Sequence, residues 1–297
     1  MNILITGGRG QLGKDCELAL STSHAVTCFD IDDLDISDSG SVNQVADRIR
    51  PEVIVNCAAF TQVDACETQT DTAWRVNVTG PENLARWARA NGALIVHIST
   101  DYVFDGKKTP PETYVETDLP APLSSYGKTK LAGEQAVTAA TDDFIILRTA
   151  WLYGVHGHNF LKTILKKTLA DPERRLTIVD DQYGSPTWSY RLALQIRHLL
   201  EHTARGVFHA SAEGYCTWYG LARYFLEKLN VPHHIAPCTT DEYRLPATRP
   251  QCVILENRRL SDAHLNIMKS WQRDIGLFVE RFGPALIEEC RKTNPGA

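Results

Sequence analysis

The chain has 297 residues, of which 43% are hydrophobic and 23% are charged, and its formal net charge is -5. This length is enough for one large α/β unit or two modest domains with a buried core, and the near-average composition excludes collagen-like, disordered and coiled-coil classes. Because the charge is mildly negative and no basic block occurs, we expect no nucleic acid partner.

The apolar segments are short throughout the chain. The longest, such as 93–96, 144–147 and 253–255, fall far below the ~20 residues that cross a membrane, so we expect no membrane partner. The eight cysteines are scattered without a C-x-x-C pair, and the first residues show no basic leader. These features predict a reduced, cytoplasmic protein.

Short apolar segments alternate with longer amphipathic ones over the first half of the chain. Strands are predicted at 3–5, 25–29, 53–55, 94–98 and 144–147, and helices at 11–20, 41–49, 70–90 and 124–139. The strand segments are apolar at successive positions, which is typical of parallel strands buried on both faces. Residues 1–150 are therefore predicted to form a doubly wound α/β domain around a parallel sheet.

Helical segments dominate after residue 151. Helices are predicted at 159–170, 188–201, 217–229 and 275–289, and short strands at 176–179 and 206–210, with proline-containing loops between them. This pattern predicts a smaller, mixed C-terminal lobe over residues 151–297 that binds the substrate. The boundary is soft, since a strand near 206–211 can return to the first sheet.

A glycine-rich segment joins the first predicted strand to the first predicted helix. Gly10 and Gly13 combine with either Gly7 or Gly8 into a dinucleotide fingerprint, which brings backbone N–H groups and a helix N-terminus to a pyrophosphate. Its place between strand and helix predicts a Rossmann domain that binds a nicotinamide dinucleotide.

Two charged residues bear on which dinucleotide binds. Asp30 ends the second predicted strand, about twenty residues after the glycines, where a carboxylate can accept hydrogen bonds from the adenosine ribose. Its charge repels a 2′-phosphate and so favours NADH. Arg9, in the glycine loop, can instead hold the 2′-phosphate of NADPH, and both cofactors stay open.

A tyrosine and a lysine stand four residues apart near the start of the predicted helix 124–139. Tyr126 and Lys130 therefore share one helix face. A nearby ammonium should lower the pKa of the tyrosine from its usual value near 10, which suits proton transfer at neutral pH. At the end of the strand 94–98, alternation lets only one of Ser99 and Thr100 face this site, where a hydroxyl can polarise a carbonyl.

Together these motifs resemble the extended short-chain dehydrogenase/reductase family, and within it the reductases of dTDP-4-keto sugars. The most specific segments are S-T-D-Y-V-F at 99–104 and D-Q-Y-G-S-P-T at 181–187. The resemblance implies hydride transfer from NAD(P)H to the C4 keto group of dTDP-4-dehydro-β-L-rhamnose. In this reaction Tyr126 protonates the new alkoxide, Lys130 is its partner, and Thr100 contacts the sugar.

The resemblance also implies the binding residues. Those around the cofactor are Gly10, Gln11, Leu12, Asp30, Asp35, Ile36, Ala59, Phe60 and Thr61, together with Tyr126 and Lys130; those at the substrate are Thr100, Asp101, Tyr126 and Trp151. Arg249 lies in a proline-bounded loop, and we expect its guanidinium to clamp the diphosphate.

The resemblance leaves metal binding and oligomeric state open. Some family members bind Mg²⁺ through acidic residues at a dimer contact, and Asp15 matches one such position only loosely. The histidines at 156, 158, 233 and 234 lack carboxylate or thiolate companions at a metal-binding spacing. We therefore predict no metal site, while a homodimer stays open.

Two alternative functions remain. A reductase of another dTDP-4-keto-deoxysugar would carry the same motifs. A non-catalytic regulatory subunit can share the fold, although the intact Thr100, Tyr126 and Lys130 argue against it. The D-Q-Y-G-S-P-T segment disfavours a sugar-nucleotide epimerase.

Overall fold

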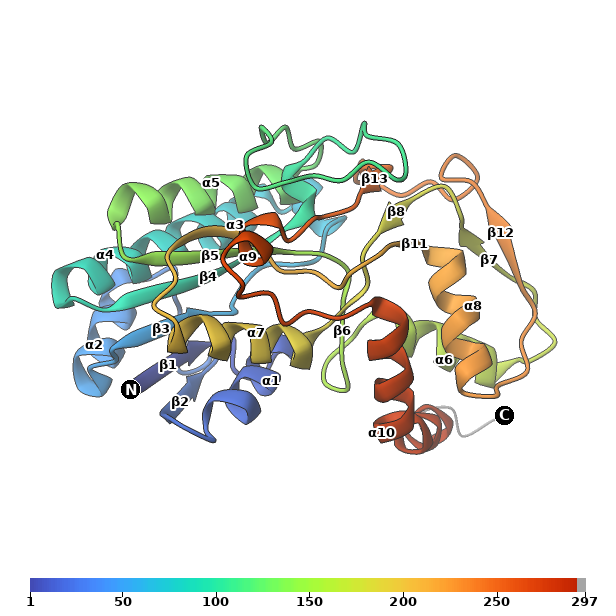
Figure 1. The fold of residues 1–297 in the computed structure, drawn as a ribbon, viewed down its shortest axis with the longest axis horizontal. Helices are drawn as coiled ribbons and strands as arrows, with labels where there is room; N and C mark the ends of the chain where they lie inside the picture. Colours follow the sequence, from blue (N-terminus) through green and yellow to red (C-terminus); the bar gives the residue numbers. More distant parts are fainter. Residues whose placement is uncertain (293–297) are drawn as a thin grey trace.

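The computed structural model describes residues 1–292 and has a six-stranded parallel sheet at its centre (Figure 1). The strands run in the order β10-β5-β4-β3-β1-β2. Their bounds are β1 Asn2–Thr6, β2 Ala25–Phe29, β3 Val53–Asn56, β4 Leu94–Thr100, β5 Phe144–Thr149 and β10 Gly206–His209. The chain passes from β2 on one side of β1 to β3 on the other, so the carboxyl ends of β1 and β3 flank the crevice where ligands bind in such sheets.

Both faces of the sheet are buried, as the apolar strand segments predict. On β1, Ile3 and Ile5 belong to the core on one face and Leu4 to the core on the other. On β3, Val53 and Val55 pair with the first face and Ile54 with the second. Because successive side chains of a strand point to opposite faces, only a continuous apolar run satisfies two helical layers. The predicted doubly wound α/β fold is confirmed.

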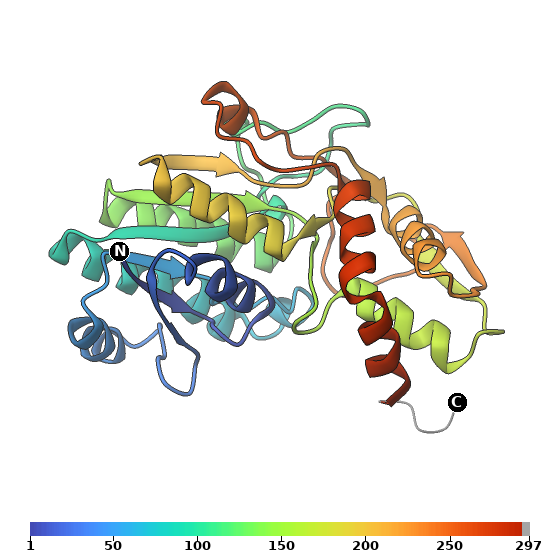
Figure 2. The same ribbon diagram turned by 60° about the horizontal axis from the view of Figure 1, so that its bottom comes forward.

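The two helical layers are α1 (Gln11–Leu20) with α7 (Ser189–Glu201), and α2 (Ser39–Ile49) with α4 (Gly80–Asn91) and α5 (Ser125–Ala140) (Figures 1 and 2). Several helices begin at residues whose side-chain oxygens accept hydrogen bonds from N–H groups of the first turn, an arrangement that stabilises helix starts. The Ser124 hydroxyl accepts a hydrogen bond from the N–H of Gly127 at the start of α5, and Asn159 caps α6 (Phe160–Ala170) in the same way. A cap at Ser124 fixes where the first turn of α5, and so Tyr126, begins.

The prediction of one helix over 70–90 is wrong. The chain forms α3 (Thr70–Trp74), a π-helical turn η2 (Arg75–Thr79) and then α4, whose first turn contains Pro81. A proline lacks the N–H that a helix interior needs, so it is best tolerated in the first turn of a helix. The π turn carries Asn77, which is buried, and π turns often mark functional sites.

A second cluster of elements lies beyond the sheet. It comprises α6, α8 (Trp218–Lys228) and α10 (Trp271–Lys292), the parallel pair β7 (Leu176–Val179) and β12 (Ile235–Cys238), and the small sheet β11 (Cys216–Thr217), β8 (Tyr183–Gly184) and β13 (Cys252–Val253). The pair β6 (Leu152–Tyr153) and β9 (Thr187–Trp188) and the short helices η1 (Ala65–Glu67), η3 (Asp101–Val103) and α9 (Arg258–Asp262) complete the described chain. Helices α6, α8 and α10 share a core of their own, which includes Trp188, Phe225 and Phe278.

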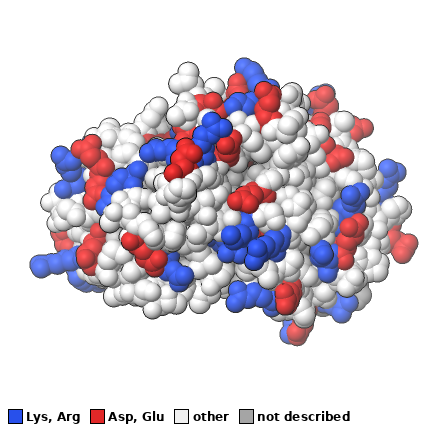
Figure 3. Space-filling model, viewed as in Figure 1, with Lys and Arg blue, Asp and Glu red and all other residues white. Residues whose placement is uncertain are grey.

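Segments after residue 150 also complete the first domain. Strand β10 pairs in parallel with β5, and α7 packs on α1 through Leu192 and Ile196. The division at residue 150 itself stays a prediction. None of the helices within residues 1–292 combines the length and apolarity that spanning a membrane requires. On the face shown in Figure 3, acidic and basic side chains are interspersed with larger uncharged areas.

Candidate active site

The glycine loop has the geometry that its sequence predicts. Gly7 adopts a φ of +66°, and a Cβ at this position would lie 2.7 Å from the backbone nitrogen of Ala58. A side chain at Gly13 would meet the Gly7 carbonyl. Gly10 donates its N–H to that carbonyl at 3.0 Å and stands at the N-cap of α1. The loop thus presents a close-packed backbone and a free helix N-terminus, a cradle that fits a pyrophosphate.

The first residues of α1 join this loop to the second cluster of elements. Leu12 is buried in the core beneath the sheet, while Gln11 is half-buried and its Oε1 accepts a hydrogen bond from the Asn159 amide at 2.9 Å. Asn159 also caps α6. The loop that would hold the pyrophosphate is therefore tied directly to a helix of the other lobe.

Asp30 lies where an adenosine ribose would meet the loop. Its Oδ2 accepts a hydrogen bond from the N–H of Arg9 at 2.8 Å, and its Oδ1 accepts one from the N–H of Ile31. The Arg9 guanidinium pairs with Asp32 and lies 3.5 Å from Asp33, and its side chain is 62% exposed. Three carboxylates surround this one cation, so a 2′-phosphate would have to compete with two of them for Arg9.

The remaining predicted cofactor residues line the same sheet edge. Ile36 is buried, and Asp35 accepts hydrogen bonds from Ser37. Ala59 and Phe60 are half-buried and Thr61 is exposed, in the segment that follows β3. Asn77 holds this segment, because its side chain accepts from the Phe60 N–H at 2.8 Å and donates to the Phe60 carbonyl at 3.1 Å.

Thr100 and Tyr126 meet at the carboxyl end of β4, and Lys130, on the same helix as Tyr126, contacts the Ile98 carbonyl on this strand. The hydroxyls of Thr100 and Tyr126 lie beside one another, and the Tyr126 ring is half-buried with Tyr102 against it at a centroid distance of 5.6 Å. Lys130 is only 2% exposed, and its Nζ donates to the Ile98 carbonyl at 2.7 Å. Ser99 points elsewhere and donates to Glu134, so of the two strand-end hydroxyls it is Thr100 that faces Tyr126.

The expected lowering of the Tyr126 pKa is wrong for this structure. Burial raises the pKa of Tyr126, and the nearby Asp101 carboxylate raises it further. The Lys130 ammonium is directed to a backbone carbonyl instead, and burial lowers its own pKa to about 8. A tyrosine that remains protonated at neutral pH is nevertheless the form required to give a proton to an alkoxide.

Asp101 is a buried carboxyl at the centre of this group. Its side chain is 2% exposed, Oδ1 accepts a hydrogen bond from the Thr100 hydroxyl at 2.9 Å, and Oδ2 has no partner among the described residues. Burial raises its pKa from 3.8 to about 7. Among the site residues it is therefore the carboxyl that changes charge near neutral pH.

We expect Asp101→Asn to remove a pH-dependent cost of folding. Because the folded pKa lies above the unfolded one, Asp101 favours the folded state at low pH, and this contribution is lost as pH rises from about 4 through about 7. Relative to the variant, the wild type should lose on the order of 3 kcal/mol of unfolding free energy between pH 4.5 and 8. Urea denaturation at both pH values measures this, and a difference that is the same at both contradicts it.

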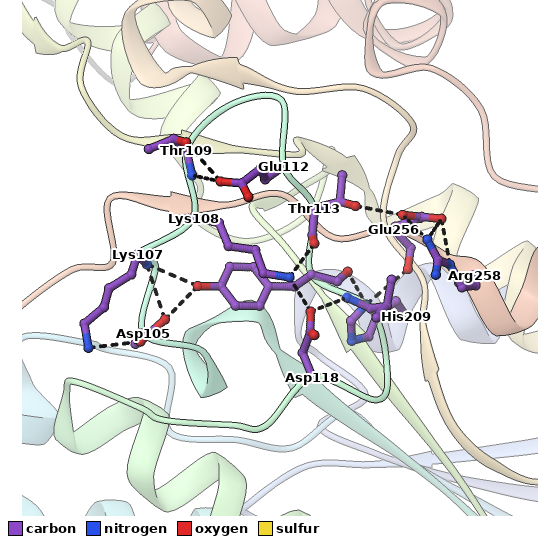
Figure 4. A network of polar contacts seen from close by, with 12 residues as sticks. Asp105, Lys107, Lys108, Thr109, Glu112, Thr113, Asp118, His209, Glu256 and Arg258 are labelled. Atoms are coloured by element: carbon purple, nitrogen blue, oxygen red, sulfur yellow. Dashed lines mark hydrogen bonds and ion pairs between the residues drawn. The ribbon is translucent and has the colours of Figure 1, made fainter.

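The loop between Thr100 and Tyr126 is held by a polar network (Figure 4). The Tyr114 hydroxyl donates to Asp105 at 2.7 Å, and the Lys108 ammonium pairs with Asp118. His209 of β10 is fully buried, and its Nδ1 lies 3.2 Å from the carbonyl oxygens of both Tyr114 and Glu256. These contacts fasten the loop to β10 and to the segment after β13, and so limit the movement of the two catalytic candidates at its ends.

A cavity of about 500 Å³ lies in the second cluster of elements, between α6, β7, α8 and the segment 240–249. Its walls combine aromatic rings, polar groups and two arginines: Phe160, Gln182, Trp218, Tyr243, Arg244 and Arg249. Gln182 is fixed at both ends of its amide, accepting from the Trp218 indole at 3.1 Å and donating to Thr240 at 3.0 Å. Aromatic walls with a few fixed polar groups suit a flat, hydrogen-bonding ring such as a nucleobase.

Trp151 forms the back of this cavity's aromatic wall. Its indole stacks on that of Trp218 with ring centroids 3.5 Å apart. Its backbone has a φ of +45°, uncommon for a bulky residue, and a side chain at Gly184 would overlap its ring. Trp151 follows β5, whose last residue, Thr149, pairs with Thr100 on β4.

Arg249 connects the cavity to the catalytic candidates. Its guanidinium makes a two-pronged ion pair with Asp64, with nitrogen–oxygen distances of 3.0 and 2.8 Å, and it lies beside the Tyr102 hydroxyl. Tyr102 in turn contacts Tyr126. A ligand that fills the cavity and reaches Tyr126 therefore passes Arg249.

Known protein families and structures identify the family to which this chain belongs. Residues 1–283 match the family model described as the RmlD substrate binding domain. The chain belongs to this family. A dTDP-4-keto-6-deoxy-D-glucose reductase of Streptomyces niveus is 41% identical over 271 residues, covering 90% of this chain and 93% of the relative.

Solved structures agree with the family assignment. A dTDP-4-dehydrorhamnose reductase of Clostridium acetobutylicum has a TM-score of 0.91 and 40% identity, covering 95% of this chain and 99% of that one. One from Bacillus anthracis, in complex with NADP, has a TM-score of 0.90 and 37% identity, with coverage of 94% and 98%. The resemblance to dTDP-sugar reductases that the motifs indicate is confirmed.

Asp15, which matches the Mg²⁺-binding position of some family members only loosely, is buried inside the protein. Its side chain is 4% exposed, it accepts a hydrogen bond from Ser189, and burial raises its pKa. A carboxyl held this way faces α7 of its own chain, and the residues here offer no fit for Mg²⁺ at a surface contact.

Sequence reasoning missed several residues of the site. Asn77 falls inside the segment predicted as an uninterrupted helix, although the Gly80-Pro81 pair was a sign of a break. Trp218, Arg244 and Asp64 come from three distant segments, and only tertiary structure brings the first two to one cavity and the third to Arg249.

Proposed function

We propose that this protein reduces the C4 keto group of dTDP-4-dehydro-β-L-rhamnose to give dTDP-L-rhamnose, using NADH or NADPH. The observation that carries the proposal is the continuity from the cavity, through Arg249 and Tyr102, to Tyr126 and Thr100. A nucleobase in the cavity would leave the diphosphate at Arg249 and the sugar at the hydroxyls of Thr100 and Tyr126. The names of the relatives support the same substrate class.

The chain's own residues supply everything but the hydride. The nicotinamide, when bound, supplies a hydride to C4. Thr100 orients the keto oxygen, and the Tyr126 hydroxyl gives its proton to the oxygen as charge develops there. Lys130, held in place by the Ile98 carbonyl, lies one helical turn after Tyr126 on α5. Its charge electrostatically favours the tyrosinate that remains.

The cofactor preference belongs to the same proposal. Asp30 accepts hydrogen bonds at the ribose position, and Arg9 is paired with Asp32 and Asp33, so we propose that NADH is used with the lower KM. The Bacillus anthracis relative is in complex with NADP, which supports NADPH as the alternative cofactor. A cytoplasmic location remains a prediction alongside this one, and a homodimer remains open.

A second candidate function is reduction of a different dTDP-4-keto-6-deoxysugar. The relative from Streptomyces niveus, 41% identical, is named for such a substrate. Loss of nicotinamide absorbance at 340 nm, followed with both keto sugars and both cofactors, separates the candidates. A higher kcat/KM for the rhamnose precursor supports the first, and no turnover with either sugar contradicts both and favours a non-catalytic subunit.

We expect Arg249→Lys to weaken binding of the sugar nucleotide. Lysine keeps the charge but loses the planar fork that makes two parallel hydrogen bonds to a diphosphate. A loss of one charged hydrogen bond corresponds to about a tenfold or greater rise in KM for the sugar nucleotide, with the KM for NADH unchanged. Arg258→Lys, at an exposed arginine paired with Glu256, is the matched control. Equal KM values in both variants would remove Arg249 from the substrate site.

A further inference from the structure

A second cluster of ligating side chains lies at the C-terminal end of α7, outside the site described above. His198, Glu201 and His202 occupy positions i, i+3 and i+4, which lie on one face of a helix. Their ligand atoms all lie within 4.8 Å of one another, and the two imidazole rings are 4.2 Å apart between centroids. Within residues 1–292, no other group of three or more His, Cys, Asp or Glu side chains brings its ligand atoms this close together.

The hydrogen bonding of the His202 ring leaves a nitrogen lone pair available for a metal ion. The Nδ1 of His202 lies 2.8 Å from the His198 carbonyl oxygen. Because a carbonyl can only accept, this contact places the ring proton on Nδ1 and leaves Nε2 of His202 with a free lone pair. His198 is half-buried one helical turn before His202, and an imidazole ring offers one nitrogen lone pair to a metal.

The surroundings of the third ligand favour a cation. Glu201 has one ionic neighbour in its helix, Arg197, with a nitrogen–oxygen distance of 3.8 Å and both side chains at least one-third exposed. Such an exposed pair contributes little, so the carboxylate can rotate toward the histidines at small cost. The cluster also lies at the negative end of the helix dipole, which stabilises positive charge in the last turn.

We propose that His198, Glu201 and His202 bind one first-row transition-metal cation of the Zn²⁺, Ni²⁺ or Cu²⁺ class. Two imidazole nitrogens select this class over Mg²⁺ and Ca²⁺, which prefer oxygen ligands. Since Glu201 and His202 are exposed, water completes the coordination. The ion cross-links side chains in the last turn of α7, the helix that packs on α1 behind the glycine loop. The site is independent of the proposed reductase function.

Titration of the metal-stripped full chain with ZnCl₂ in a calorimeter tests the proposal. We expect one Zn²⁺ bound per chain, and at least a tenfold weaker affinity in His202→Gln, because even residues that only support a metal ligand contribute roughly tenfold to affinity. His202 is exposed, so this variant should fold. His234→Gln changes an exposed histidine outside the cluster and should bind Zn²⁺ like the wild type. Equal affinity in all three proteins, or no binding by the wild type, overturns the site.

Copper provides an independent spectroscopic readout. The electron paramagnetic resonance spectrum of the Cu²⁺-loaded chain should show hyperfine coupling to two imidazole nitrogens, and that of His198→Gln or His202→Gln to one. MgCl₂ in place of ZnCl₂ should give no heat of binding. A two-nitrogen spectrum that persists in both variants assigns the copper to other histidines and contradicts the proposal.

Discussion

Replacing Tyr126 with phenylalanine is expected to lower kcat by a factor of about 10³, within the range that a positioned proton donor contributes. The ring and its edge contact with Tyr102 remain, so the substrate site keeps its shape and the KM for NADH should not change. What disappears is the hydroxyl beside Thr100, which is the proposed proton donor to the alkoxide. Steady-state rates at saturating NADH and keto sugar measure the effect.

Tyr102→Phe is the matched control for this substitution. It also removes one hydroxyl and keeps the ring, but that hydroxyl contacts Arg249 rather than Thr100. We expect it to change kcat less than about tenfold and to act mainly on the KM of the sugar nucleotide. If Tyr126→Phe and Tyr102→Phe lowered kcat equally, the assignment of Tyr126 as proton donor would be wrong.

Breaking the buried ion pair between Glu134 and Arg148 is expected to have the largest effect on stability. Three hydrogen bonds of 3.0, 3.3 and 2.7 Å join the side chains, which are 5% and 6% exposed. Ser99 donates to the same carboxylate. This pair connects α5 to β5 and β4. Glu134→Ala leaves the guanidinium buried without a counter-charge, which should cost about 3–5 kcal/mol of unfolding free energy.

A surface pair in the same domain is the control. Arg86 and Glu82 form an i,i+4 pair on α4, with the arginine 70% exposed, and Glu82→Ala should cost less than about 0.5 kcal/mol. Replacing both Glu134 and Arg148 with methionine should recover most of the loss, because no unpaired charge remains buried. Urea unfolding of the four proteins measures these differences, and similar losses for Glu134→Ala and Glu82→Ala would contradict the argument.

The same substitution should also lower the pKa of Lys130, the proposed partner of Tyr126. The Glu134 carboxylate raises the pKa of Lys130, which burial otherwise lowers to about 8. Without Glu134, Lys130 would lose part of its charge near neutral pH. The buried pair therefore stabilises the sheet and also keeps Lys130 cationic.

The sequence by itself determined the sheet and the glycine loop, because both depend on local rules. Successive apolar residues at Ile3, Leu4 and Ile5 can be buried only by a strand covered on both faces. The spacing of Gly7, Gly10 and Gly13 likewise follows from one tight turn and one helix start. Tyr126 and Lys130 were also predictable as a pair, since the helix repeat alone places them on one face.

Only the tertiary structure decided the electrostatics and the substrate cavity. Burial raises the pKa of Tyr126 and lowers that of Lys130, opposite to what their spacing suggested for the tyrosine, because desolvation depends on every neighbour and not on residues four positions away. Arg249 meets Asp64 across 185 residues, and Trp151, which follows β5, stacks on Trp218 of α8. No local pattern encodes such contacts, because packing between distant segments sets them.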